Sequence, residues 1–313
     1  MIEFNNFSKG QEDFFLVKFI DDNKVEINML FDGGISSKKC LEHIKDDVNR
    51  KVDYIILTHI DQDHIKGLLK LYTEEEDNNL KSKLKDTVFV YNRFVNGIVS
   101  YNQAEAFEKM IQGREIICSY KEYQDNSGNA IFLSAEQRRK LPKKEKNQIY
   151  ITFLSPTDRK EIEPLYDYYQ QYKEKNKNPS GNAYVVNKSS IMCLVEYEET
   201  LLLMAGDGYF KDILPTFKIL TGSQTICPIS MNALIKISHH GSSDNNEGLD
   251  EIIGITQCDK FVITNVEEAQ RNGKNSVKVA DYILELSKNS SVSVYSNSDY
   301  EGLEITKEQS ISL

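Results

Sequence analysis

Apolar and polar positions alternate along the chain in short blocks that predict strands and helices in turn. The runs 14–20 and 25–31 are rich in Phe, Val and Ile and are separated by the polar residues 21–24, which predicts a hairpin of two strands. Apolar residues then recur at spacings of three and four, which predicts a helix over 36–50. The fully apolar run 54–57 has the length of a strand that is covered on both faces.

The same kinds of pattern continue to the end of the chain. Further strands are predicted at 87–91, 131–133, 149–154, 191–197, 200–205, 233–237, 261–264, 292–295 and 303–305, and further helices at 65–71, 103–111 and 276–286. No sharp linker divides the chain, and its two halves repeat a similar plan. We therefore expect one α/β (α+β) domain, residues 1–313, in which two sheets pack together and helices flank them.

Two polar segments, at about 73–125 and 156–187, are predicted to be insertions in this domain. The first opens with the strongly charged residues 73–86. The second is rich in Tyr and Lys, and we interpret it as a helix that ends by residues 174–179, together with a loop. Its tyrosines fit an amphipathic helix packed on the core better than a surface on which nucleic-acid bases stack.

Composition narrows the class of protein. The 313 residues are 40% hydrophobic and 27% charged, which is typical of a soluble globular protein. The net charge of −10 repels polyanions at long range and argues against a broad nucleic-acid-binding surface, but not against a local site whose metal ions carry positive charge. Five scattered cysteines form no CxxC pair. Without an apparent leader or a bilayer-length apolar run, we expect a cytoplasmic protein with no membrane partner.

Four of the five histidines lie in two short stretches, Thr-His-Ile-Asp-Gln-Asp-His at 58–64 and Ser-His-His-Gly at 238–241. Each follows a predicted strand, where open α/β folds usually place their chemistry. Imidazoles interleaved with carboxylates are typical of metal ligands. Asp207, which follows an apolar run and a glycine, is a candidate to bridge two ions. Asp63 could instead cap a helix and Asp207 could belong to a turn, but neither alternative explains their recurrence with the histidines.

These motifs resemble those of metallo-β-lactamase-fold hydrolases and are similar to the metal-dependent domain of ComEC-type DNA-uptake proteins. That branch has Asp at the second ligand position, here Asp61, and a His-His-Gly-Ser loop, here 239–242. Weaker agreement lies at Gly10-Gln11-Glu12-Asp13, Asp32-Gly33-Gly34 and Asn187-Lys188-Ser189-Ser190. The resemblance covers roughly residues 7–70 and 149–305.

The resemblance implies a four-layer αββα metallo-β-lactamase sandwich with a helical insertion and two divalent metal ions at one edge. It assigns His59 and Asp61 to the first ion, Asp63 and His64 to the second, and Asp207 to a bridge between them. The last ligand is His239 or His240. The oxygen-rich ligand set favours Mn²⁺, and Zn²⁺ is retained as an alternative.

One expected ligand has no counterpart in the sequence. The fold's usual third-motif histidine is missing, because residues 65–238 contain no histidine. Asn187 and Ser189 are the candidates to lie near the position of that histidine.

The expected function is a metal-dependent hydrolase, most plausibly a phosphodiesterase or nuclease in which a metal-activated water attacks the substrate. Asp63 and the pair His239 and His240 are the candidate catalytic residues, since the histidine that binds no metal could protonate the leaving group. Candidates for phosphate contact are Lys66, Lys236 and Lys274. A hydrolase of a carboxylic ester, lactone or thioester, or an inactive binding or signalling module, is the alternative. The sequence leaves open whether the protein forms a homo-oligomer or binds a regulatory partner protein.

Overall fold

The predicted hairpin forms and anchors a seven-stranded sheet in the computed structural model. The structure describes residues 1–8, 12–20, 24–46, 51–71, 78–92, 102–119, 122–124, 130–132, 149–157, 163–165, 183–223, 232–264, 281–297 and 310–313. The first sheet has the order β15–β1–β2–β3–β4–β5–β6. Its strands are β1 (Ile2–Asn6), β2 (Phe15–Ile20), β3 (Glu26–Phe31), β4 (Tyr54–Ile56), β5 (Val88–Val90), β6 (Ile116–Ile117) and β15 (Ser310–Ser312). Strands β15 to β3 pair antiparallel, and β3 to β6 pair parallel.

The second sheet has six strands in the order β14–β13–β12–β11–β10–β9. They are β9 (Ile149–Ser155), β10 (Met192–Tyr197), β11 (Thr200–Met204), β12 (Asn232–Lys236), β13 (Lys260–Val262) and β14 (Ser293–Tyr295). Strands β9 to β11 pair antiparallel and β11 to β14 pair parallel. A separate pair is formed by β7 (Glu122–Gln124) and β8 (Ala130–Phe132).

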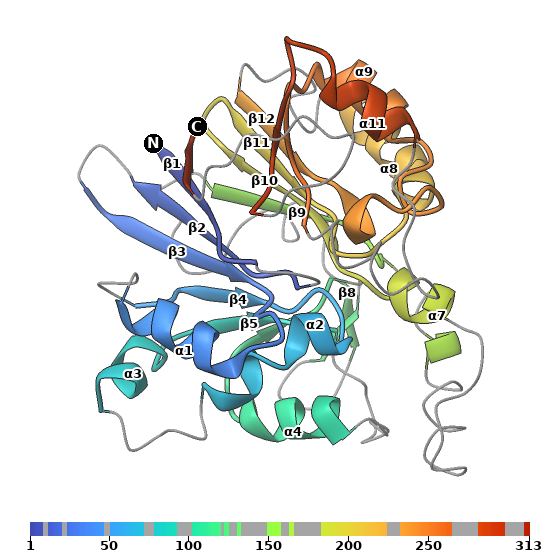
Figure 1. Cartoon of the computed structure of the whole chain (residues 1–313). Coiled ribbons are helices and arrows are strands. Elements are labelled where there is room, and N and C mark those ends of the chain that lie inside the picture. Colours follow the sequence, from blue (N-terminus) through green and yellow to red (C-terminus); the bar gives the residue numbers. More distant parts are fainter. Residues whose placement is uncertain are drawn as a thin grey trace, which may run out of the picture.

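Helices cover the outer face of each sheet (Figure 1). The helices of the first half are α1 (Ser37–Asp46), α2 (Gln62–Ile65), α3 (Asn78–Lys83) and α4 (Asn102–Met110), with a 3₁₀ turn η1 (Leu68–Lys70). Those of the second half are α7 (Ala183–Lys188), α8 (Phe210–Gly222), α9 (Leu249–Thr256) and α11 (Asp281–Ser287), with the 3₁₀ turn η4 (Ser238–Gly241).

Strand periodicity divides the apolar side chains among three buried layers, because neighbouring residues of a strand face opposite ways. In β2, Leu16 packs with the helices of the first half. The next residue, Val17, packs between the two sheets. In β11, Leu203 packs with α8 and α9, whereas Leu202 faces the first sheet. The structure thus confirms the expected order of layers, helices, sheet, sheet and helices.

Some local expectations changed. The helix predicted over 65–71 begins earlier and is divided into α2 and η1. Asp63 lies inside α2, whose N-cap is Asp61, so the helix-capping alternative for Asp63 is wrong. Strands β5 and β6 fall in the segment 73–125 but are hydrogen-bonded into the first sheet.

Other expectations fall outside the described residues. They concern the turn at 21–23, most of the 156–187 segment, the start of the helix predicted at 276–286, and the strand at 303–305. The single domain with its insertions therefore stays a prediction. Within the described part of the chain, no helix has both the length and the apolar composition needed to cross a bilayer.

Candidate metal centre

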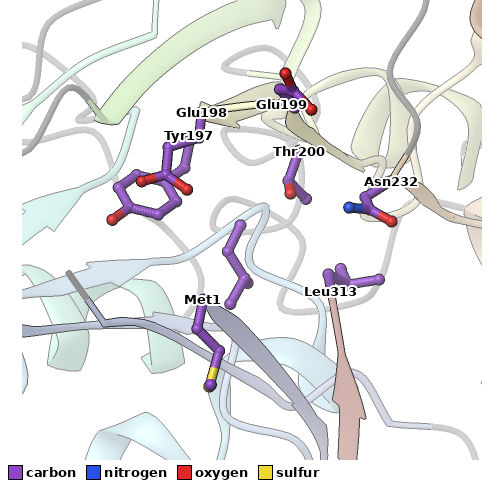
Figure 2. A pocket seen from close by; sticks show the side chains of 8 residues that line it. Met1, Tyr197, Glu198, Glu199, Thr200, Asn232 and Leu313 are labelled. Atoms are coloured by element: carbon purple, nitrogen blue, oxygen red, sulfur yellow. The ribbon is translucent and has the colours of Figure 1, made fainter. Parts of the chain in front are cut away.

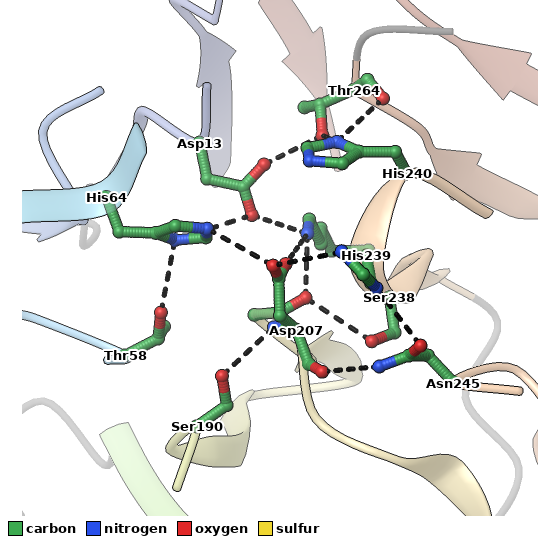
Figure 3. A network of polar contacts seen from close by, with 12 residues as sticks. Asp13, Thr58, His64, Ser190, Asp207, Ser238, His239, His240, Asn245 and Thr264 are labelled. Carbon is green, nitrogen blue, oxygen red and sulfur yellow. Dashed lines mark hydrogen bonds and ion pairs between the residues drawn. The ribbon is translucent and has the colours of Figure 1, made fainter. Parts of the chain in front are cut away.

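The candidate residues converge where parallel strands of the two sheets end. Loops that follow β4, β11 and β12 carry the first histidine motif, Asp207 and the second histidine motif, respectively. Parallel strands bring their carboxyl ends to one edge of a sheet, and the sandwich sets the two edges against each other. Figure 3 shows His64, Asp207, His239 and His240 gathered in this region.

One cluster joins His59, His64 and Asp207, whose ligand atoms all lie within 4.8 Å of one another. The Nε2 atoms of His59 and His64 lie 3.8 Å and 3.5 Å from Asp207 Oδ2. All three residues are buried.

A second cluster joins Asp63, Asp207 and His240, so Asp207 is common to both. His240 Nε2 and His64 Nε2 lie 3.8 Å and 3.7 Å from Asp63 Oδ2. Ligand atoms of Asp207 thus lie within 4.8 Å of those of the other members of both clusters.

Asp61 and His239 lie at the rim of the centre. Asp61 Oδ2 is 3.7 Å from His59 Nε2, but its side chain is 45% exposed. His239 Nε2 is 3.8 Å from Asp207 Oδ2, with the side chain 25% exposed. His240 is the more buried of the two adjacent histidines and the one that joins a cluster.

The buried donor atoms fit a metal ion. In the described part of the chain, His59 Nε2, His64 Nε2 and Asp207 Oδ1 are buried without a hydrogen-bond partner. The opposite ring nitrogens are occupied, since His59 Nδ1 lies 3.1 Å from Ser190 Oγ and His64 Nδ1 lies 2.8 Å from Asp32 Oδ2. Such contacts orient an imidazole so that its other nitrogen faces a metal. Imidazole nitrogens with carboxylate oxygens suit zinc and manganese alike.

Residues 15–101 match the model of the metallo-β-lactamase superfamily, and this stretch contains the whole first histidine motif. Over this stretch the chain is similar to the metallo-β-lactamase superfamily. Its four layers agree with the metallo-β-lactamase sandwich, which confirms the expected fold. None of the curated proteins matches the chain in sequence.

Solved structures similar to this chain include a diphosphatase of the PhnP family, with 11% identity and a TM-score of 0.41, covering 90% of this chain and 94% of that one. A long-form RNase Z from yeast has 12% identity and a TM-score of 0.41, and the match covers 84% of this chain and 37% of that one. CmlA, a diiron β-hydroxylase from Streptomyces venezuelae, has 9% identity and a TM-score of 0.41, with 83% and 44% covered. The chain thus spans less than half the length of the last two.

Two polar residues that support the histidines were not singled out from the sequence. Asp32, directly after β3, accepts hydrogen bonds from the Thr58 backbone N–H and hydroxyl, both at 2.8 Å, besides contacting His64. A carboxylate at the end of a strand is a signal for such a supporting role, but no role of its own was assigned to Asp32 from the sequence. Ser190 contacts His59 and accepts the Asp207 N–H at 3.1 Å.

Neither residue expected near the missing third-motif histidine lies in a metal cluster. Ser189 donates its hydroxyl to the Val186 carbonyl at 2.6 Å, and Asn187 Nδ2 lies 3.3 Å from His239 Nδ1. It is the adjacent Ser190, between α7 and β10, that reaches the buried side of the centre.

The expected phosphate contact by Lys236 is wrong. This side chain is fully buried and ion-paired with Asp13, so its ammonium cannot meet a substrate at the surface. The sequence of β12 gave no warning, because a lysine at a strand end is usually solvated. Lys66 is exposed, and Lys274 lies outside the described residues.

The charges of the centre lower the pKa values of two aspartates and raise those of two histidines. Burial alone would raise the pKa of Asp63, but His64 and a hydrogen bond from His240 outweigh it and lower that pKa to about 2. Burial would likewise raise the pKa of Asp207, yet His239 and His64 hold it well below its usual range. Burial opposes protonation of His64, but Asp32 and Asp207 raise its pKa well above the ordinary value. The pKa of His240 is also raised, against burial, chiefly by its hydrogen bond with Asp63.

Two hollows differ in their relation to the centre. A cavity of about 10 Å³, the size of one water molecule, is lined by Thr58, His59, Tyr91 and Asn92 and touches the centre. A larger cavity of about 390 Å³ lies between the chain ends and the turn that joins β10 to β11 (Figure 2). Asp207 lies beyond the other end of β11, so this cavity is remote from the metal cluster.

Proposed function

We propose that the protein is a metal-dependent hydrolase of phosphodiesters, a phosphodiesterase or nuclease. The observation that carries the proposal is the set of buried, hydrogen-bond-free ligand atoms of His59, His64 and Asp207, which adjoins Asp63 and His240. Buried polar atoms without partners are costly, and a metal ion would satisfy them. The superfamily match supports a hydrolytic use of such a site.

We propose two ions, Zn²⁺ or Mn²⁺, held by six of the seven residues that the sequence singled out, with His239 left free of metal. The distances favour His59, His64 and Asp207 around one ion and Asp63, Asp207 and His240 around the other, with Asp61 at the rim of the first. Bound metal ions supply Lewis acidity, which polarises a phosphoryl oxygen and lowers the pKa of a coordinated water.

The residues of the chain then have separate tasks. Asp63 remains ionised at neutral pH, because its pKa is about 2, and its carboxylate can therefore orient the attacking water by accepting a hydrogen bond from it. His239, at the exposed rim, is positioned to protonate the leaving group. Its Nδ1 lies 3.0 Å from Asn245 Oδ1, which fixes the ring, and its backbone φ of 41° turns it away from the path of a regular helix.

The substrate class rests on the ComEC-type resemblance and on charge. The net charge of −10 disfavours tight binding of a long duplex, since a polyanion would be repelled outside the centre. We therefore favour a short or single-stranded nucleic acid, or a nucleotide, as the substrate. The protein would act in the cytoplasm.

A substrate panel tests the proposal. With Mn²⁺ or Zn²⁺, the protein should cleave an aryl phosphodiester and at least one of single-stranded DNA, RNA or a cyclic nucleotide. Asp63→Ala and His64→Ala should each abolish this activity, whereas Lys109→Ala, on exposed α4, should leave it unchanged. Cleavage of esters, lactones or thioesters alone would favour the alternative hydrolase, and metal-free, inactive protein would favour a binding module.

Metal uptake should strengthen as pH rises. The raised pKa values of His64 and His240 mean that both imidazoles bind protons in the metal-free protein, and a metal must displace those protons. At pH values below these pKa values, each proton that the metal displaces should weaken the apparent metal affinity by about tenfold for every unit by which the pH falls. Calorimetric titration with Mn²⁺ at pH 6 and pH 8, in buffers of different ionisation enthalpy, measures both effects. Equal affinity at the two pH values without proton release would contradict the ligand assignment.

A further inference from the structure

A buried lysine lies beside the candidate centre. Lys236 ends β12 and has no exposed surface. Its ammonium donates a hydrogen bond to the Gly206 carbonyl at 2.8 Å, forms an ion pair with Asp13, and lies 3.9 Å from Asp207 Oδ1. Removing an ammonium from water is expensive, so the fold retains it only where oxygen atoms surround it.

Asp13, the partner of this lysine, is tied to three other segments of the centre. Its N–H donates to the Asp63 carbonyl at 3.2 Å, and its own carbonyl accepts the Gly34 N–H at 3.0 Å. Its Oδ1 accepts the Thr264 hydroxyl at 2.7 Å. Thr264 in turn contacts His240 Nδ1 through its hydroxyl and carbonyl oxygens, at 3.0 Å and 3.1 Å (Figure 3).

These contacts connect Lys236 to both metal clusters. On one side its ammonium reaches the Gly206–Asp207 turn, and on the other Asp13 and Thr264 orient His240. Three buried carboxylates, Asp13, Asp32 and Asp207, lie close together here, since Asp13 and Asp32 both face His64 Nδ1. Without a nearby positive charge such carboxylates repel one another and favour protonation.

We propose that Lys236 is a positioning residue whose ammonium acts as an internal cation, holding Asp13 and the Gly206–Asp207 turn in place before any metal ion binds. The inference rests on the metal-binding part of the proposed function and is independent of the substrate. It also explains why Asp13, in the Gly-Gln-Glu-Asp segment, is fully buried far from the histidine motifs in sequence.

Lys236→Met tests this role through stability and metal binding. In a chelator, the variant should unfold at a temperature about 10 °C lower than the unchanged protein, because its carboxylates lose their buried partner. Saturating Mn²⁺ should raise the unfolding temperature of Lys236→Met more than that of the unchanged protein, since the ion replaces the missing charge at Asp207. Lys260→Met, on the neighbouring strand β13 and ion-paired with exposed Asp259, is the matched control and should change little.

A double variant separates a charge effect from a packing effect. Asp13→Asn combined with Lys236→Met removes both members of the pair and should recover most of the lost stability. This recovery is also the decisive result if Lys236→Met alone does not fold. Additive losses in the double variant, its failure to fold, or an equal loss with and without Mn²⁺ would overturn the proposal. If the unchanged protein takes up no Mn²⁺, the proposed function fails, while the comparison in chelator still decides the role of Lys236.

Discussion

Asp207→Asn is expected to empty both metal positions and to abolish hydrolysis. Its carboxylate is common to the two clusters, so one substitution weakens both. The amide keeps the size of the side chain but removes the negative charge that His59 and His64 face at 3.8 Å and 3.5 Å. Changes in residues that merely support ligands typically cost about 10- to 100-fold in metal affinity or activity, and a shared ligand should cost at least about 100-fold.

Asp61→Asn is the matched control for this experiment. Asp61 is also an aspartate beside His59, but it is half-exposed and lies outside both clusters. We expect it to retain at least one ion per chain and a measurable part of the activity. The measurements are metal content after gel filtration and the rate with the best substrate of the panel. An Asp207→Asn protein with two ions and more than a tenth of the original rate would refute the bridging assignment.

Gly67→Ala is expected to lower the free energy of unfolding by about 3 kcal/mol, because the new methyl group would collide with backbone. A Cβ at this position would lie 1.7 Å from the Gly33 carbonyl oxygen. That approach cannot be relieved by a side-chain rotation, since Gly67 N–H is hydrogen-bonded to the Gly34 carbonyl at 2.8 Å and Gly33 N–H to the His64 carbonyl at 2.9 Å. Displacing this contact would also move His64.

Gly254→Ala makes the same chemical change where space is open. No atom lies within 4 Å of a Cβ added there, in the interior of α9. It should therefore raise stability, by about 0.5–1 kcal/mol, through helix propensity alone. Urea unfolding of both variants in a chelator measures the difference without a metal contribution. Equal stability of the two variants would show that the Gly33–Gly67 contact opens at little cost.

The sequence predicted features that local chemistry dictates. The apolar runs 14–20 and 25–31 predicted the hairpin, and strand-end motifs placed His59, His64 and Asp207 at one edge. The burial of Lys236 and Asp13 could not be predicted from local patterns, because it depends on partners far along the chain. The Thr264–Asp13 hydrogen bond joins residues 251 positions apart. Strand β15 was missed for a similar reason, since the three residues Ser310–Ser312 become a strand only by pairing with β1.

The separation of the candidate ligands along the chain has a consequence for the order of folding. The first histidine motif belongs to one sheet, whereas Asp207 and His240 belong to the other, and the Ser190–His59 contact between them spans 131 positions. Contacts of such long range require large loops to close, and they form late. Each of the two clusters that share Asp207 takes residues from both halves of the chain. The docking of the two sheets thus sets the earliest moment at which the folding chain can capture its metal.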